Sequence, residues 1–225
     1  MGTRTDPSFS SAHDLVSIDV MPLTVVASHH LCTIIASNAK KRKSKMQKSV
    51  FDERDLAPPN CEAVKPDVIN VAAFFGLAVE RAQFNQDVVV GALILFDRFV
   101  SALPRHDLAW SWRLLLLLSM CIVQKLIDDE ALGSDQFAEL WDDATATSSL
   151  AYKITAKQVA GLETELLKVM RFEVYIASKD WHKINARLRA LWLRKYHSTP
   201  FSLALRNDDV KRTFQRREAK ERATG

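Results

Sequence analysis

Apolar and polar residues follow one another in blocks along the chain, and the longest apolar block lies near its centre. Leu114–Val123 is apolar throughout except for Ser119. This run is about half of the roughly 20 residues needed to cross a bilayer, and a helix that is apolar on every side is normally buried. Leu, Met and Cys favour a helix over a buried strand. We therefore expect the segment Trp110–Glu130 to contain the central helix of an all-α domain.

Further helical patterns with recognisable ends lie on both sides of this segment. Asn85, Ser134 and Thr155 are suited to cap the residues that follow them, and Thr155 opens a capping box. Pro22 and Pro66 suit the first turns of helices. The predicted helices cover residues 23–37, 68–82, 86–102, 135–141, 156–170 and 179–195.

These patterns predict five helices in one domain, with the third buried, and one helix on either side of that domain. Gly161 is expected to mark a close approach between helices, because glycine inside a helix otherwise costs about 1 kcal/mol relative to alanine. The predicted core consists of Leu93, Phe96, Trp112, Leu115, Leu116, Leu118, Ile122, Val123, Leu166 and Phe172. The expected segments are a disordered N-terminus (1–13), an extension with a helix, a basic run and a proline-containing linker (14–65), the five-helix domain (66–176), a C-terminal helix (177–196) and a charged, loosely ordered tail (197–225).

Composition and charge narrow the class of protein only a little. A hydrophobic content of 48% and a charged content of 26% are those of a globular protein. The net charge of +4 is weak support for a nucleic-acid partner, and none is expected. The three cysteines have no CxxC spacing, which predicts buried thiols in a reducing compartment and neither disulfides nor a zinc site. We expect no signal peptide, because residues 1–11 are polar.

Two features near the N-terminus have a plain and a functional interpretation. The basic run Lys40–Lys48 is interpreted as a solvated helix end or loop, with a nuclear signal or a phosphate-binding patch as alternatives. Membrane attachment is expected only if Gly2 is myristoylated, and Asp6 stands where that signal usually has Ser or Thr. The expected location is cytoplasmic, with the nucleus and the inner face of the plasma membrane as alternatives.

The sequence contains no pattern typical of an enzyme. No GxSxG, HExxH, phosphate-binding or kinase glycine loop is present. The acidic residues 128–130 cannot all face one ion from a helix and are expected just beyond its end. The histidines show no ligand spacing with cysteine or acidic residues. We expect a non-catalytic protein without metal or cofactor.

Three stretches of the five-helix region resemble the cyclin box of the cyclin family. They are ALILFDRFVS (92–101), WRLLLLLSMCIVQKLIDDEAL (112–132) and LETELLKVMRFEV (162–174), and the resemblance covers about 66–176. They correspond to the end of the second helix, the third helix and the fifth helix of that box. The cyclin Y branch is the most similar, because of VFDERDLAPP (50–59), LRALW (188–192) and FSLAL (201–205).

The resemblance implies a regulatory subunit that binds the αC helix of a cyclin-dependent kinase and holds it in the active position. PCTAIRE- or PFTAIRE-type kinases are the expected partners, and the kinase of the fungal phosphate-system cyclins is the alternative. Lys125 and Glu163 are then the pair that hydrogen-bonds the kinase main chain, with Asp128, Asp129 and Lys168 in support.

The sequence departs from the cell-cycle cyclins at one structural residue. Asp97 of the DRF motif is expected in the core, but no MRAIL-like stretch supplies its usual arginine partner. Arg98 or a backbone donor would then have to satisfy its carboxylate.

Two other functional classes remain open. A transcription factor of the TFIIB type would need a second cyclin repeat and a strongly basic face. A helical scaffold would need no kinase.

The tail contains Thr213 after Lys211 and Arg212, a context that basophilic kinases use. Phosphorylation of flanking serines would imply a 14-3-3 partner, although the motifs that recruit one are not clearly reproduced.

Overall fold

The computed structural model describes residues 11–40, 49–59, 61–103, 106–146, 148 and 150–196, with side chains described for residues 23–39 and from 49 to 194 within these ranges. This part of the chain contains seven α-helices, two short 3₁₀ helices and no strand, which confirms the all-α class. The α-helices are α1 (Ser11–Lys40), α2 (Val68–Arg81), α3 (Gln86–Ala102), α4 (Trp112–Ile127), α5 (Ser134–Thr145), α6 (Ala156–Val169) and α7 (Ser178–Tyr196), and the 3₁₀ helices are η1 (Glu53–Asp55) and η2 (Leu108–Trp110).

The cap signals place most helix starts correctly. The side chain of Asn85 accepts a hydrogen bond from the backbone N–H of Val88 at 3.0 Å, and α3 has the predicted bounds. Thr155 and Gln158 form the predicted capping box, in which each side chain accepts from the backbone N–H of the other, at 3.2 and 2.8 Å. Helix α5 is capped by Gly133 instead of Ser134, and it continues past the predicted end to Thr145.

Helix α1 is longer than its sequence pattern predicts. It covers Ser11–Lys40, so Pro22 lies in its interior instead of its first turn. An interior proline costs about 3 kcal/mol. The burial of apolar side chains on α1, such as those of Leu23 and Leu31, offsets this cost. Residues 11–13 belong to α1 and are not part of a disordered terminus. The other predictions for residues 1–10, for 41–48 and for the tail 197–225 fall outside the described residues.

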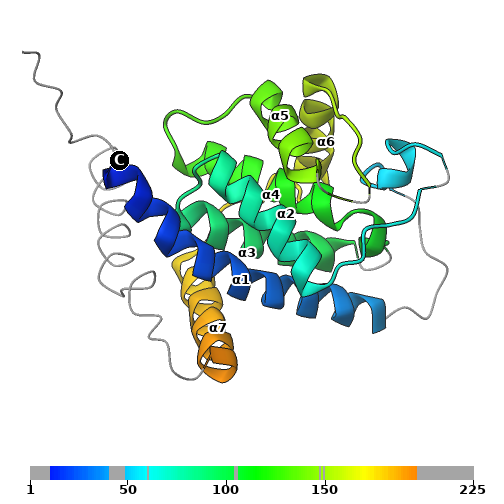
Figure 1. The fold of residues 1–225 in the computed structure, drawn as a ribbon. Coiled ribbons are helices and arrows are strands. Elements are labelled where there is room, and N and C mark those ends of the chain that lie inside the picture. The colour runs from blue at the N-terminus through cyan, green and yellow to red at the C-terminus, as the bar shows by residue number, and fades with distance from the viewer. Residues whose placement is uncertain are drawn as a thin grey trace, which may run out of the picture.

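The helices pack around α4, whose residues from Trp112 to Gln124 are all buried. Helix α4 packs against α3, α6, α2 and α5. Helix α1 runs along one side of the molecule and is crossed there by α7, whereas α5 and α6 lie on the opposite side (Figure 1). Within the described residues, no helix combines the length and apolar character needed to cross a membrane.

The predicted core is confirmed at its apolar positions except Phe172, and Asp97, which was also expected in the core, is only half-buried. The residues that are buried as expected are Leu93, Phe96, Trp112, Leu115, Leu116, Leu118, Ile122, Val123 and Leu166. The side chain of Phe172 is 64% exposed. Phe172 was expected in the core because of its residue type, although it follows the predicted helix 156–170. The chain leaves α6 after Val169 and turns, with Arg171 and Phe172 at φ angles of 53° and 59°, and this turn exposes the Phe172 ring.

The glycine that allows a close helix approach is Gly91, and the prediction for Gly161 is wrong. A Cβ atom built on Gly161 would have no neighbour within 4 Å, because this residue lies on the exposed side of α6. A Cβ atom on Gly91 would lie 2.6 Å from Cγ1 of Val123, where α3 packs against α4. The pattern did not separate the two positions, because both glycines lie inside a predicted helix.

A buried ion pair fastens the segment before α2 to the start of α4. Arg113 donates from Nε to Oε2 of Glu53 at 3.1 Å, and from Nη1 to the carbonyl oxygen of Leu150 at 2.8 Å. Arg113 and Glu53 are both almost completely buried. Burial raises the pKa of the Glu53 carboxyl, and the charge and hydrogen bonds of Arg113 act against this shift. The pair therefore fixes η1 and the loop after α5 on the N-terminal end of α4.

Candidate functional site

The structure brings Lys125 and Glu163 together, although 38 residues separate them in the sequence. Lys125 lies in the last turn of α4 and Glu163 lies on α6, which packs against α4. The Nζ atom of Lys125 donates to Oε2 of Glu163 at 2.6 Å. The side chains are 34% and 14% exposed, so both reach the surface while part of the ion pair is shielded. The two charges predicted to act together therefore form one pair at the molecular surface.

The surroundings of the pair keep Lys125 charged. Burial by itself would lower the pKa of the Lys125 amine, but the hydrogen bond and charge of Glu163 outweigh it, and the net shift is upward. Cys121 lies one helical turn before Lys125, and burial together with the Glu163 charge raises the pKa of its thiol to about 12. A thiol with this pKa is neutral at physiological pH and is a poor nucleophile. The site therefore presents a fixed charge pair and no reactive group of this kind.

The residue that follows Lys125 in the chain is an exposed leucine. This residue, Leu126, is 46% exposed although α4 is otherwise buried up to Gln124. Phe172 and Tyr175, which follow α6, are also exposed. Exposed apolar side chains can contribute to protein-binding surfaces, although single ones are common on any protein. No sequence pattern singles out Leu126, and its only signal is its position after Lys125 at the end of the apolar run.

The three residues predicted to support the pair are placed differently. Lys168 forms an ion pair with Glu165, three residues before it on α6, at 2.7 Å. Asp128 caps the end of α4 through its backbone N–H, and Asp129 is exposed. Among the described residues, no hydrogen bond or ion pair joins Asp128, Asp129 or Lys168 to Lys125 or Glu163. The observed site is therefore the pair alone.

The acidic residues 128–130 follow the end of α4 at Ile127, where they were expected. Across the described ranges, no group of three His, Cys, Asp or Glu side chains is arranged so that it could hold a metal ion. No residue set in this part of the chain therefore suggests a metal centre.

Asp97 is half-buried and faces a cleft between helices instead of the core. Its neighbour Arg98 is not its partner. Arg98 donates to the carbonyl oxygen of Tyr175 and to the carboxylate of Asp180, both at 2.7 Å. These bonds tie α3 to the start of α7, so Arg98, one of the two alternatives expected to satisfy Asp97, is used elsewhere. The chain has no second guanidinium on α3 that could replace it.

The chain was compared with models of known protein families and with solved structures, and neither comparison finds a match.

Proposed function

We propose that this chain is a cyclin-type regulatory subunit that binds and activates a cyclin-dependent protein kinase of the PCTAIRE, PFTAIRE or phosphate-system type. In this proposal the face with Lys125 and Glu163 packs against the kinase αC helix. The observation that carries the proposal is the ion pair between these two residues, at the surface and across two packed helices.

The chemistry of the pair suits the recognition of main-chain groups. An ammonium group has three N–H donors, so Lys125 retains donors for a partner's carbonyl oxygen after it binds Glu163. Glu163 uses Oε2 for Lys125, and its other oxygen can accept from a partner's backbone N–H. A backbone segment that offers both a carbonyl oxygen and an N–H group therefore matches the pair.

The order of the helices also supports the proposal. Five helices, α2 to α6, follow one another with the third one buried, and α1 and α7 flank them. The resemblance to the cyclin box implies this order, with the lysine on the third helix of the five and the glutamate on the fifth. A subunit of this kind acts by binding the active kinase conformation more tightly than the inactive one, which shifts the kinase population.

The experiment is co-purification and a kinase assay with candidate kinases. We expect the wild-type chain to bind and activate one of them. The Lys125→Glu variant should bind more weakly, because loss of a charged hydrogen-bond partner at an interface costs about 2–5 kcal/mol, or roughly 30- to several-thousand-fold in affinity.

The matched control is Lys157→Glu, which makes the same charge change at an exposed residue at the start of α6. This variant should bind the kinase like the wild type. Failure of the wild type to bind any of these kinases would contradict the proposal. Binding without activation would replace it with a scaffold function.

A further inference from the structure

A cleft of about 590 Å³ lies between α1, α3 and α7, and its lining residues include none from α4 or α6. It is therefore separate from the face of Lys125 and Glu163. Cavities of this size are typical of sites for small molecules. Ile34, Val100, Ala190 and Leu191 supply apolar lining, and apolar atoms make up most of the exposed surface of the cleft. The other lining residues are polar or charged.

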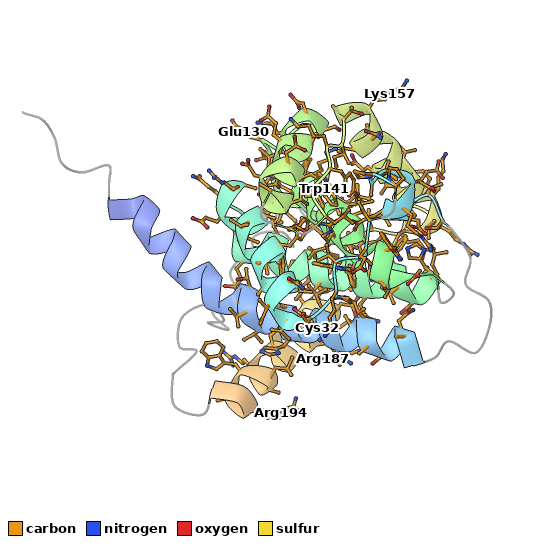
Figure 2. The ribbon with its side chains drawn as sticks, turned by 45° about the vertical axis from the view of Figure 1, so that its right-hand side comes forward. Cys32, Glu130, Trp141, Lys157, Arg187 and Arg194 are labelled. Atoms are coloured by element: carbon orange, nitrogen blue, oxygen red, sulfur yellow. The ribbon has the colours of Figure 1, made fainter. Side chains whose placement is uncertain are left out.

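Two arginines project from one face of α7 into the lining of this cleft. Arg187 and Arg194 are two helical turns apart, which places them on the same side of the helix about 10 Å from each other along its axis. Figure 2 shows both on α7, on the side of the molecule away from Lys157. Neither guanidinium has a hydrogen bond or ion pair with a residue that the structure describes, in contrast to Arg98, which is paired with Asp180.

The α1 side of the cleft contains buried polar atoms without partners. Nε2 of His30 and Oδ1 of Asn38 are buried, and neither has a hydrogen-bond partner among the described residues. Both side chains are more than nine-tenths buried, and both line the cleft. Buried polar atoms are rarely left without a partner, so two of them at one cleft suggest that a ligand supplies the missing bonds.

Asp97 of α3 adds a carboxylate to the same lining. Its charge acts to raise the pKa of His30, whereas the charge of Arg187 acts to lower it. A carboxylate accepts hydrogen bonds and repels anions. The part of a ligand near Asp97 must therefore carry hydrogen-bond donors and no negative charge. The cleft therefore combines two arginines that have no partner among the described residues with a group of acceptors that suits hydroxyl groups.

We propose that this cleft binds a small phosphorylated polyol of the sugar-phosphate class. Arg187 and Arg194 hold the phosphate group, because the guanidinium fork matches phosphate oxygens and two arginines match its double charge. Asp97, His30 and Asn38 hold the hydroxyl groups. The described lining contains no Phe, Tyr or Trp on which a nucleobase could stack, so a nucleotide fits less well.

The test is isothermal titration of the full chain with glucose 6-phosphate, ribose 5-phosphate and glycerol 3-phosphate, with glucose and inorganic phosphate as reference probes. We expect at least one ester to bind more tightly than either reference. Arg187→Gln and Arg194→Gln should each weaken its binding at least tenfold. The matched control is Lys183→Gln, an exposed position on α7 outside the lining, which should leave binding unchanged.

A second variant tests the polyol part of the proposal. Asp97→Asn should weaken binding of the ester and leave binding of inorganic phosphate unchanged or stronger. The proposal is overturned if none of the three esters binds, if the arginine variants bind like the wild type, or if inorganic phosphate binds as tightly as every ester. Kinase binding plays no part in these measurements, so their outcome is independent of the proposed function.

Discussion

Gly91 of α3 lies so close to Val123 of α4 that a methyl group at Gly91 would meet Cγ1 of Val123 at 2.6 Å. The same methyl group would lie 3.2 Å from Cη2 of Trp181 on α7. Three helices therefore meet at a point where only a hydrogen atom fits. This contact sets the distance of α3 from the central helix, and α3 is the helix that carries Asp97 and Arg98.

This contact predicts opposite effects for the same substitution at two glycines. Gly91→Ala should lower the free energy of unfolding by about 1–3 kcal/mol, because it overpacks a filled core. Gly161→Ala should raise it by up to about 1 kcal/mol, because alanine favours the helix and no atom lies within 4 Å of the added group. Urea denaturation measures both. A Gly91→Ala variant as stable as the wild type would contradict the packing described.

The buried ion pair predicts that removing one partner is costly. Glu53→Ala should lower the free energy of unfolding by about 3–5 kcal/mol, because it leaves the charge of Arg113 buried without its acid. The double variant Glu53→Ala with Arg113→Ala should lose clearly less than the sum of the two single losses. Denaturant unfolding of the four proteins measures the coupling. Additive losses would show that the two residues do not act as a pair.

His30 predicts a loss of stability in mild acid. Burial, and then the charge of Arg187, lower the pKa of His30 below 6.5, against the opposing effect of Asp97. The unfolded chain then takes up the proton at a higher pH than the folded chain. The contribution of His30 is therefore complete above pH 6.5 and decreases as the pH falls through that value, by at most about 1.4 kcal/mol per pH unit.

Denaturation at pH 8 and pH 5.5 measures this effect by comparison with a variant. His30→Gln removes the titrating group, so it should lose less stability between the two pH values than the wild type does. Equal losses in the two proteins would show that His30 is not the group responsible. The measurement is made without added phosphate esters, which would bind near the same residue if the cleft accepts them.

Local sequence signals predicted the helices well because each signal lies within a few residues of the structure that it specifies. Asn85 and the Thr155–Gln158 box bond to backbone groups in their own first turn, so their spacing alone identifies the helix start. The burial of α4 was predicted because its apolar run covers all sides of the helix and not one face only. Helix α1 was predicted too short, because Pro22 was interpreted as the start of the helix. The packing of α1 against α2, α3 and α7 stabilises a longer helix, and no local pattern shows this packing.

Contacts between distant residues were predicted poorly, because no local pattern encodes them. Arg113 and Glu53 are 60 residues apart, and neither residue type suggests burial. Phe172 was assigned to the core on its type, but the turn at Arg171 and Phe172 exposes it. Lys125 and Glu163 were selected together only through the resemblance to the cyclin box. Their proximity is a result of the fold, whereas their role toward a kinase remains a prediction.

A structural role and a binding role for the Lys125–Glu163 pair predict different results when both charges are exchanged. The double variant Lys125→Glu with Glu163→Lys restores an ion pair between α4 and α6. If the pair only holds these helices together, the double variant should regain whatever either single variant loses. If the pair binds main-chain groups of a kinase, its donor and acceptor are now interchanged, and binding should stay lost.

The most direct test is therefore the affinity of the double variant for the kinase that the wild type activates, measured beside its thermal melt. We predict a melting temperature close to that of the wild type, with kinase binding weakened at least 30-fold, as for a lost charged hydrogen bond of about 2 kcal/mol. A double variant that melts like the wild type and binds and activates the kinase like the wild type would contradict the proposed role of the pair.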